Sequence, residues 1–178
     1  MGFTKVIDTE VHRGSRFSVH EVRFRAADGR EFDRDVVHHP GAVAVVPLHE
    51  DGTVTLVRQY RAALEQNLLE LPAGLRDVEG EPDVRTAERE LLEEAGLAAT
   101  ELEHLVTFHN SPGYCDESVG IFLATGLNQV PDDRQGIEEE AMTIERISLD
   151  DALVMVGDGR ITDAKTIIGL TLTARRIP

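Results

Sequence analysis

The sequence is poor in cysteine and aromatic residues, and it lacks long apolar runs. It contains one cysteine, Cys115, and no tryptophan, and only 4% of its 178 residues are aromatic. A lone cysteine cannot form an internal disulfide, which is typical of a protein kept in the reducing cytoplasm. No apolar stretch approaches the length of a membrane span, and the first residues contain no apolar signal segment. We therefore expect a cytoplasmic protein with an aliphatic core and no membrane partner.

Positive charge is also scarce. The 18 Lys and Arg face 33 Asp and Glu, which gives a formal net charge of −15. Nucleic acid and anionic membranes both require a positive surface, so we expect neither as a partner. Histidine shows no spacing typical of a zinc site, and His38, His39, His104 and His109 are interpreted as structural.

The order of apolar runs and turn residues predicts an α/β protein with a small N-terminal β-meander. Residues 1–39 contain three strand-like runs, broken at residues 13–15 and at Asp28-Gly29. The run GAVAVVPL after Pro40 predicts a buried strand, with TVTLVRQY as its partner after Asp51-Gly52. Later strands are expected in ELEHLVTFHN, ESVGIFLATGL and TIERIS, with helices starting near Ser148 and Thr162. We expect residues 40–178 to form the main domain, with α/β layers.

One short helix carries an unusual concentration of carboxylates. Glu90, Glu93 and Glu94 share one face within two turns, and Glu81 precedes the helix. Like charges at this spacing destabilise a helix, and Arg89 offers the local compensation. A hard divalent cation that binds oxygen ligands, such as Mg²⁺, would supply the remaining positive charge. The alternative is a solvated acidic face.

The ends of this helix are well marked, so its carboxylates lie on a firmly placed element beside a buried face. Water screens like charges poorly at such a place, which favours a bound cation over a solvated acidic face. An apolar stripe runs beside the acidic face, with Asp83 expected as the N-cap and Gly96 as the terminating glycine. The stripe consists of Val84, Ala87, Leu91 and Ala95.

The segment from Gly74 to Leu97 resembles the signature of the Nudix hydrolases. From Glu81 onward the pattern matches throughout, with seven residues between Glu81 and Arg89 and then RELLEEAGL. One departure is that six residues, and not five, separate Gly74 from Glu81. The resemblance implies an α/β/α sandwich on a mixed sheet. It also implies Glu90, Glu94 and the Ala73 carbonyl as metal ligands, and Glu93 as a ligand or a partner of Arg89. Glu81 would complete the metal site by anchoring the loop or a further water.

Within that family the chain is most similar to ADP-ribose pyrophosphatases. Pro112 lies fifteen residues after Leu97, in SPGYCDES, and the segment Gln59 to Gly74 is also similar. This resemblance implies Mg²⁺-dependent hydrolysis of ADP-ribose to AMP and ribose 5-phosphate, with Mn²⁺ able to replace Mg²⁺. Another nucleoside diphosphate sugar remains an alternative substrate. A non-catalytic ADP-ribose-sensing domain remains an alternative of a different class.

The remaining site residues follow from the same resemblance and from their chemistry. The acidic run at residues 136–140 matches the loop that carries the general base, with Glu139 as first choice and Glu138 as second. A solvated acidic loop is the alternative for that run. Arg58 and Arg61 suit a phosphate or a terminal ribose phosphate, with an exposed charged pair as the alternative. Tyr114, beside Pro112, either stacks on adenine or caps the loop. Three strands with one apolar face need another surface to pack against. We therefore expect residues 1–39 to pack on a second copy in a homodimer and to contribute to its substrate pocket.

Overall fold

The computed structural model describes residues 2–131 and 141–177, which divide into two compact units. The first unit comprises Met1–Gly41 and Phe108–Ser118, and the second comprises Ala42–Thr107 and Val119–Pro178. Within the described residues, no helix has both the length and the apolar character that a membrane crossing needs.

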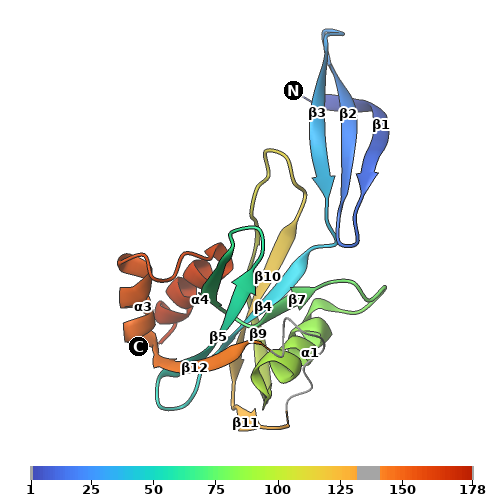
Figure 1. The fold of residues 1–178 in the computed structure, drawn as a ribbon. Helices are drawn as coiled ribbons and strands as arrows, with labels where there is room; N and C mark the ends of the chain where they lie inside the picture. The colour runs from blue at the N-terminus through green and yellow to red at the C-terminus, as the bar shows by residue number, and fades with distance from the viewer. Residues whose placement is uncertain (1, 132–140, 178) are drawn as a thin grey trace. The chain divides into compact units, whose positions relative to one another are not determined.

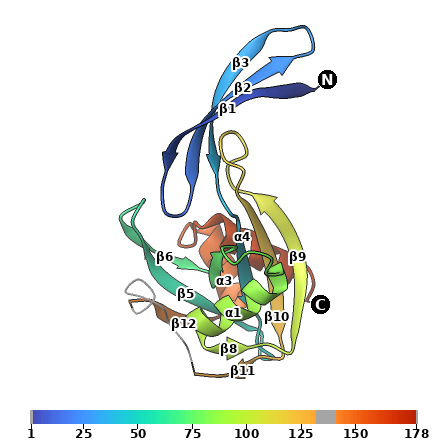
Figure 2. The same ribbon diagram turned by 90° about the vertical axis from the view of Figure 1, so that its right-hand side faces the viewer.

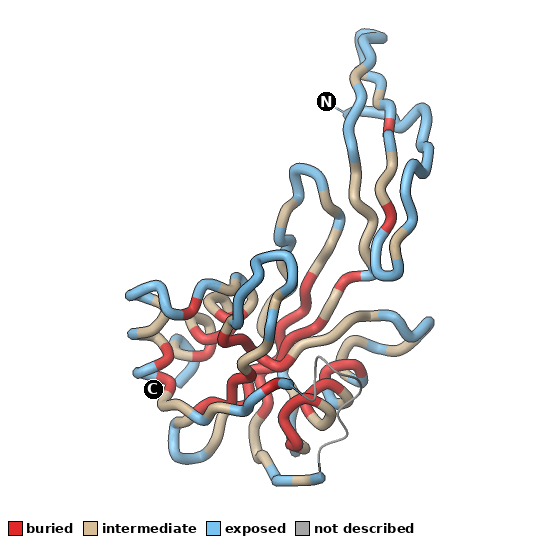
Figure 3. The backbone as a smooth tube through the Cα atoms, viewed as in Figure 1, coloured by how far each residue is buried: buried red, intermediate tan, exposed pale blue. Residues whose placement is uncertain are grey.

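The first unit contains the expected antiparallel β-meander. Its strands are β1 (Phe3–Arg13), β2 (Ser18–Ala26) and β3 (Glu31–His38), hydrogen-bonded in the order β1-β2-β3 (Figure 1). The turns fall at the two breaks expected from glycine. The meander is thin, because among residues 2–41 only Ser18, Val22 and Gly41 are buried, and the rest of the sheet is exposed or half-buried (Figure 3).

The second unit contains the mixed sheet that the sequence predicted. Its strands are ordered β7-β4-β10-β9, where β4 (Ala42–Pro47) runs parallel to β10 (Ser118–Thr125) and antiparallel to β7 (Ala73–Leu75). The fourth strand is β9 (Glu101–His109), and β8 (Leu97–Ala98) pairs with β11 (Asn128–Gln129). A second sheet, in the order β12-β5-β6, contains β12 (Thr143–Ser148), β5 (Thr53–Arg61) and β6 (Gln66–Glu70).

Helices cover both faces of the mixed sheet, which confirms the α/β/α sandwich (Figure 2). Helix α1 (Asp83–Ala95) packs Ala87 and Leu91 against Val43, Val45 and Phe122. Alternate residues of the same strands face α4 (Ala164–Ala174), because a Cβ added at Gly169 would lie 2.9 Å from Val46 and 3.4 Å from Ile121. Helix α3 (Leu149–Gly157) begins after Ser148, whose hydroxyl accepts the Asp151 N–H as expected. The last helix begins one residue later than expected, with Asp163 as its N-cap.

The expected pairing of the first two buried strands is wrong. GAVAVVPL and TVTLVRQY do form β4 and β5, but they belong to different sheets and meet at a single bridge, Leu48 to Val54. β4 is buried from Val43 to Pro47, and β5 is buried from Val54 to Val57. A continuous apolar run indicates that both faces of a strand are covered, but it does not indicate which neighbour forms its hydrogen bonds.

Candidate active site

Helix α1 supports the acidic cluster and has clear ends. Its N-cap is Pro82, whose carbonyl accepts the N–H groups of Arg85 and Thr86, so the expectation that Asp83 caps the helix is wrong. Asp83 is the first helical residue, where a carboxylate is stabilised by the positive end of the helix. Gly96 ends the helix with a φ of 61°, the left-handed conformation that glycine adopts most easily. The apolar stripe contacts the core as expected.

Two of the helix glutamates are buried. Glu90 is 6% exposed and Glu94 is 5% exposed, whereas Glu88 on the same helix has a side chain that is 46% exposed. Glu93 lies between these extremes, with 17% of its side chain exposed. The burial of Glu90 and Glu94 excludes a solvated acidic face for these two residues, and it raises the cost of their charge unless a cation is nearby.

Arg89 is the cation that contacts this cluster. Its Nη1 donates to Glu90 Oε1 at 2.6 Å and to Glu93 Oε2 at 3.0 Å, and its Nη2 lies 3.7 Å from Glu81 Oε2. Desolvation opposes the charge on Arg89, but the Glu90 and Glu93 carboxylates outweigh this effect and raise its pKa. One guanidinium therefore faces the carboxylates of Glu81, Glu90 and Glu93, while Glu94 also interacts electrostatically with Arg61.

Strand β7 contacts the acidic cluster through Ala73 and Gly74. A Cβ added at Gly74 would lie 2.0 Å from the Glu90 carboxyl group, so any side chain at this position would displace that carboxyl group. The next residue back, Ala73, donates its N–H to Glu94 Oε2 at 2.8 Å. The observed contact of Ala73 is made by its amide, and the role of its carbonyl as a metal ligand stays a prediction.

The additional residue between Gly74 and Glu81 leaves Glu81 attached to the helix. Thr86 Oγ1 donates to Glu81 Oε2 at 2.8 Å, and the Glu81 N–H donates to the Val78 carbonyl at 3.1 Å. Glu81 thus joins the loop to the first turns of α1, which is consistent with a loop anchor.

Sequence reasoning missed a buried ion pair directly before this loop. Glu70 has a side chain that is 1% exposed, and it accepts two hydrogen bonds from Arg61, at 2.7 and 2.6 Å, and another from Lys165. Burial tends to raise the pKa of Glu70, but Arg61 and Lys165 outweigh it and lower the pKa. The available signal was a carboxylate inside the apolar run Leu68–Leu71.

The other predicted residues divide between the two units. Arg58 Nε donates to Glu145 Oε1 at 2.6 Å across β5 and β12, so both β5 arginines are held by carboxylates. Pro112 and Tyr114 belong to the first unit, where the Tyr114 carbonyl accepts the Val37 N–H at 2.7 Å. Tyr114 is 60% exposed. Glu138 and Glu139 lie outside the described residues.

The donor set fits a hard divalent cation. Glu81, Glu90, Glu93 and Glu94 offer carboxylate oxygens, and no histidine or cysteine belongs to this cluster in the described part of the chain. Oxygen ligands of this kind suit Mg²⁺ or Mn²⁺ rather than softer metals. Because Gly74 leaves no space for a side chain next to Glu90, the backbone approaches the carboxylates closely.

Comparison with known proteins agrees with this geometry. The NUDIX domain model matches residues 37–168. The chain is 39% identical to the ADP-ribose pyrophosphatase of Mycobacterium tuberculosis (strain ATCC 25618 / H37Rv), over 94% of this chain and 81% of that protein. It is 40% identical to the ADP-ribose pyrophosphatase of Bacillus subtilis (strain 168), over 78% and 75% of the two chains.

A solved structure gives the same result for the fold. A crystal structure described as an ADP compounds hydrolase superposes with a TM-score of 0.84 and 26% identity, over 99% of this chain and 94% of that chain. The family model spans well over half of the sequence, and it contains the whole acidic helix with its preceding strand. The chain therefore belongs to the Nudix hydrolase family.

Proposed function

We propose that this hydrolase uses Mg²⁺ to cleave the pyrophosphate bond of ADP-ribose, which yields AMP and ribose 5-phosphate. The observation that carries the proposal is the pair of buried carboxylates, Glu90 and Glu94, held against Gly74 and the Ala73 amide. Two relatives at about 40% identity are named ADP-ribose pyrophosphatases, which supports this substrate. Mn²⁺ offers the same preference for oxygen ligands and is proposed as a substitute.

The chain's own residues would bind and orient the reacting groups. Glu90 and Glu94 would be direct ligands, together with the Ala73 carbonyl, and Glu93 would be a further ligand or the partner that holds Arg89. When bound, the cation neutralises phosphoryl oxygens that would otherwise repel a nucleophile. Arg89 would keep the glutamates in their positions, because it bonds to both Glu90 and Glu93.

A separate carboxylate would activate the water, because a carboxylate that binds a cation is a poor base. We propose Glu139 for this role, with Glu138 as second choice. General bases contribute about 10²–10⁴-fold to rate. Glu139→Gln should therefore lower kcat by this factor without weakening Mg²⁺ binding. If neither Glu139→Gln nor Glu138→Gln lowers kcat, the base lies elsewhere in the chain.

The substrate contacts are proposed from charge and exposure. The side chains of Arg58 and Arg61 are 39% and 37% exposed, so both remain partly accessible to a phosphate. Tyr114 has an exposed ring suited to stacking on adenine, with Pro112 beside it in the same loop.

A product screen tests the proposal. Purified protein with Mg²⁺ is given ADP-ribose, ADP-glucose, GDP-mannose, NADH, diadenosine polyphosphates and 8-oxo-dGTP in separate reactions, and products are separated by chromatography. AMP and ribose 5-phosphate should form fastest, from ADP-ribose. A higher kcat/KM for another nucleoside diphosphate sugar would assign the site to that substrate. Binding of ADP-ribose without turnover would identify a sensing domain instead.

We also propose a cytoplasmic homodimer in which the N-terminal meander packs on a second copy. Strand β1 leaves large apolar side chains exposed, including Phe3 at 65% and Val11 at 52%. Exposed strand edges and apolar faces favour pairing with another chain. Light scattering should give the mass of a dimer at micromolar concentration, and Val11→Asp should shift it toward the monomer. A fully active monomeric wild type would contradict this arrangement.

A further inference from the structure

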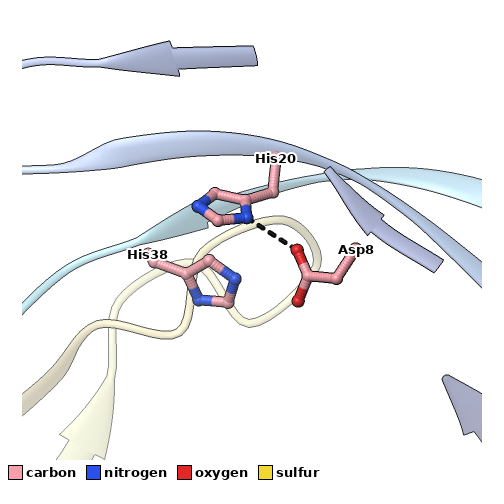
Figure 4. Close-up of side chains that lie close together, drawn as sticks. All are labelled: Asp8, His20 and His38. Atoms are coloured by element: carbon pink, nitrogen blue, oxygen red, sulfur yellow. Dashed lines mark hydrogen bonds and ion pairs between the residues drawn. The ribbon is translucent and has the colours of Figure 1, made fainter. Parts of the chain in front are cut away.

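A second group of potential metal ligands lies in the first unit, on the N-terminal meander. Asp8 on β1, His20 on β2 and His38 on β3 each offer one ligand atom, and these atoms all lie within 4.8 Å of one another (Figure 4). Figure 4 shows one nitrogen of each imidazole turned toward the Asp8 carboxylate. None of these residues belongs to the acidic helix or to the segment that the family signature covers.

The pairing of the three strands brings these residues together. Glu10 lies opposite His20, so Asp8 is two residues along β1 and faces the same side of the sheet. His20 lies opposite Val36, so His38 is likewise two residues along β3 and on that same side. Diagonal neighbours of this kind are within reach of long side chains. The spacing of these residues in the sequence hides this arrangement, so spacing alone favours a structural interpretation of His38 and does not single out His20.

Both histidines are oriented by bonds through their other nitrogen. Asp116 Oδ2 lies 2.5 Å from His38 Nδ1, and Ser18 Oγ lies 3.0 Å from His20 Nε2. An imidazole that binds a metal typically donates its second N–H to a carboxylate or another acceptor, which fixes the ring and its tautomer. This pattern leaves His38 Nε2 and His20 Nδ1 as the nitrogens that face Asp8.

The two closest ligand atoms need a proton or a metal ion between them. His20 Nδ1 lies 2.6 Å from Asp8 Oδ1, and two lone pairs at this distance would repel unless a proton or a metal ion lies between them. Lys5 Nζ contacts the other oxygen, Asp8 Oδ2, at 2.5 Å, and Glu10 Oε2 lies 3.8 Å from His20 Nε2. The cluster therefore contains the carboxylates of Asp8, Glu10 and Asp116 around two imidazoles and one lysine.

We propose that Asp8, His20 and His38 bind a late first-row divalent metal ion such as Zn²⁺, separately from the Mg²⁺ of the acidic helix. Two imidazoles and one carboxylate suit zinc and its neighbours, whereas Mg²⁺ prefers oxygen ligands. Tetrahedral zinc ligands lie about 3.4 Å apart, so Asp8 would move away from His20 Nδ1 as the more distant atoms move in. The side chains of Asp8, His20 and His38 are 29%, 16% and 35% exposed, which leaves the site open to water as a fourth ligand.

Such an ion would join all three strands of a sheet that has almost no core. Small units that bury little apolar surface are often stabilised by a metal. Strand β1 is exposed along its whole length, and the bond through Asp8 would attach it to β2 and β3. Amide hydrogen exchange in β1 should therefore slow when the metal binds.

The test is a Zn²⁺ titration of the metal-free full-length protein, competed against a chromophoric chelator, with millimolar Mg²⁺ present to occupy the acidic helix. The wild type should bind one Zn²⁺ per chain. His20→Gln, His38→Gln and Asp8→Asn should each weaken binding at least about tenfold. His104→Gln removes a histidine that bonds to Thr107 in the second unit, and it should leave the affinity unchanged. Glu94→Gln should also leave it unchanged.

Two binding results would overturn the proposal, and one hydrogen-exchange result would do the same. One is Zn²⁺ binding that is insensitive to the His20, His38 and Asp8 variants, or that is lost in Glu94→Gln instead. The other is the absence of any Zn²⁺ binding in the wild type, in which case the His20 Nδ1–H simply donates a hydrogen bond to Asp8. Circular dichroism establishes that each variant is folded, and Asp8→Asn repeats the test without changing either imidazole. Hydrogen exchange in β1 that is unaffected by bound Zn²⁺ would also contradict the site.

Discussion

Two carboxylates that face arginines of the same strand allow a controlled test of what burial does to an ion pair. Glu70 binds Arg61, and Glu145 binds Arg58, with both arginines on β5 and exposed to nearly the same extent, 37% and 39%. The carboxylates differ, because the Glu70 side chain is 1% exposed and that of Glu145 is 33% exposed. Replacement by glutamine keeps the shape and removes the charge in each case.

The expected costs follow from this difference. Removing one partner of a buried pair costs about 3–5 kcal/mol, because the remaining charge is left without compensation. Arg61 is more than a third exposed, and Lys165 retains Asp163 at 3.0 Å. Glu70→Gln should therefore reduce the free energy of unfolding by about 3 kcal/mol, at the lower end of that range. Glu145→Gln should cost less than about 1 kcal/mol, as exposed pairs do.

Urea unfolding, followed by far-ultraviolet circular dichroism, measures both variants. The pH dependence gives an independent check. Since folding lowers the pKa of Glu70 below its ordinary 4.5, its charge stabilises the protein above pH 4.5, and this contribution is lost as pH falls through the lowered pKa. The difference between wild type and Glu70→Gln should be constant near neutrality and shrink in acid. Equal costs for the two variants, or a difference that grows in acid, would refute the reasoning.

Two further predictions concern the acidic cluster on α1, and a third concerns Asp51 in the turn before β5. Glu94→Gln should lower kcat by at least about 100-fold in a steady-state assay, since it removes a charged ligand. Glu88 is exposed on the same helix, so Glu88→Gln should retain near-wild-type activity in that assay. Gly74→Ala should lower kcat by about 10²-fold by displacing the Glu90 carboxyl, while Gly157→Ala, whose Cβ would meet no atom within 4 Å, should not. Thr53 and Arg146 lower the pKa of Asp51 to about 2, so its stabilising charge should be lost between pH 3.8 and about 2, as an NMR titration of its carboxyl group would show.

The parts of the fold that could be predicted from the sequence depend on neighbouring residues. The helix containing Glu90 and Glu94 was predicted because the apolar stripe repeats at helical spacing and Gly96 ends it in the left-handed conformation. The three meander strands were predicted because glycine marks their turns. In these cases the residues that determine the structure are close together in the sequence, so the sequence alone is enough to predict the helix and the strands.

The parts that could not be predicted depend on residues far apart in the sequence. The pairing of β4 with β10 joins residues more than seventy positions apart, and no turn residue specifies it. One of the two partners of Glu70 was hidden for the same reason, since Lys165 lies on the last helix, 95 residues away, whereas Arg61 lies only nine residues away. A buried carboxylate in an apolar run indicates that a cation partner exists, but it does not identify which one.

The acidic cluster itself combines both kinds of information. Sequence spacing places Glu90 and Glu94 on one helical face, but spacing alone is equally compatible with a solvated surface. The decision between the two comes from Gly74, because the strand can approach the Glu90 carboxyl only where a Cβ is absent. The same approach brings the Ala73 amide to Glu94 and removes both carboxylates from water. The glycine of the signature is thus the residue that converts an acidic helix face into a site with a need for a cation.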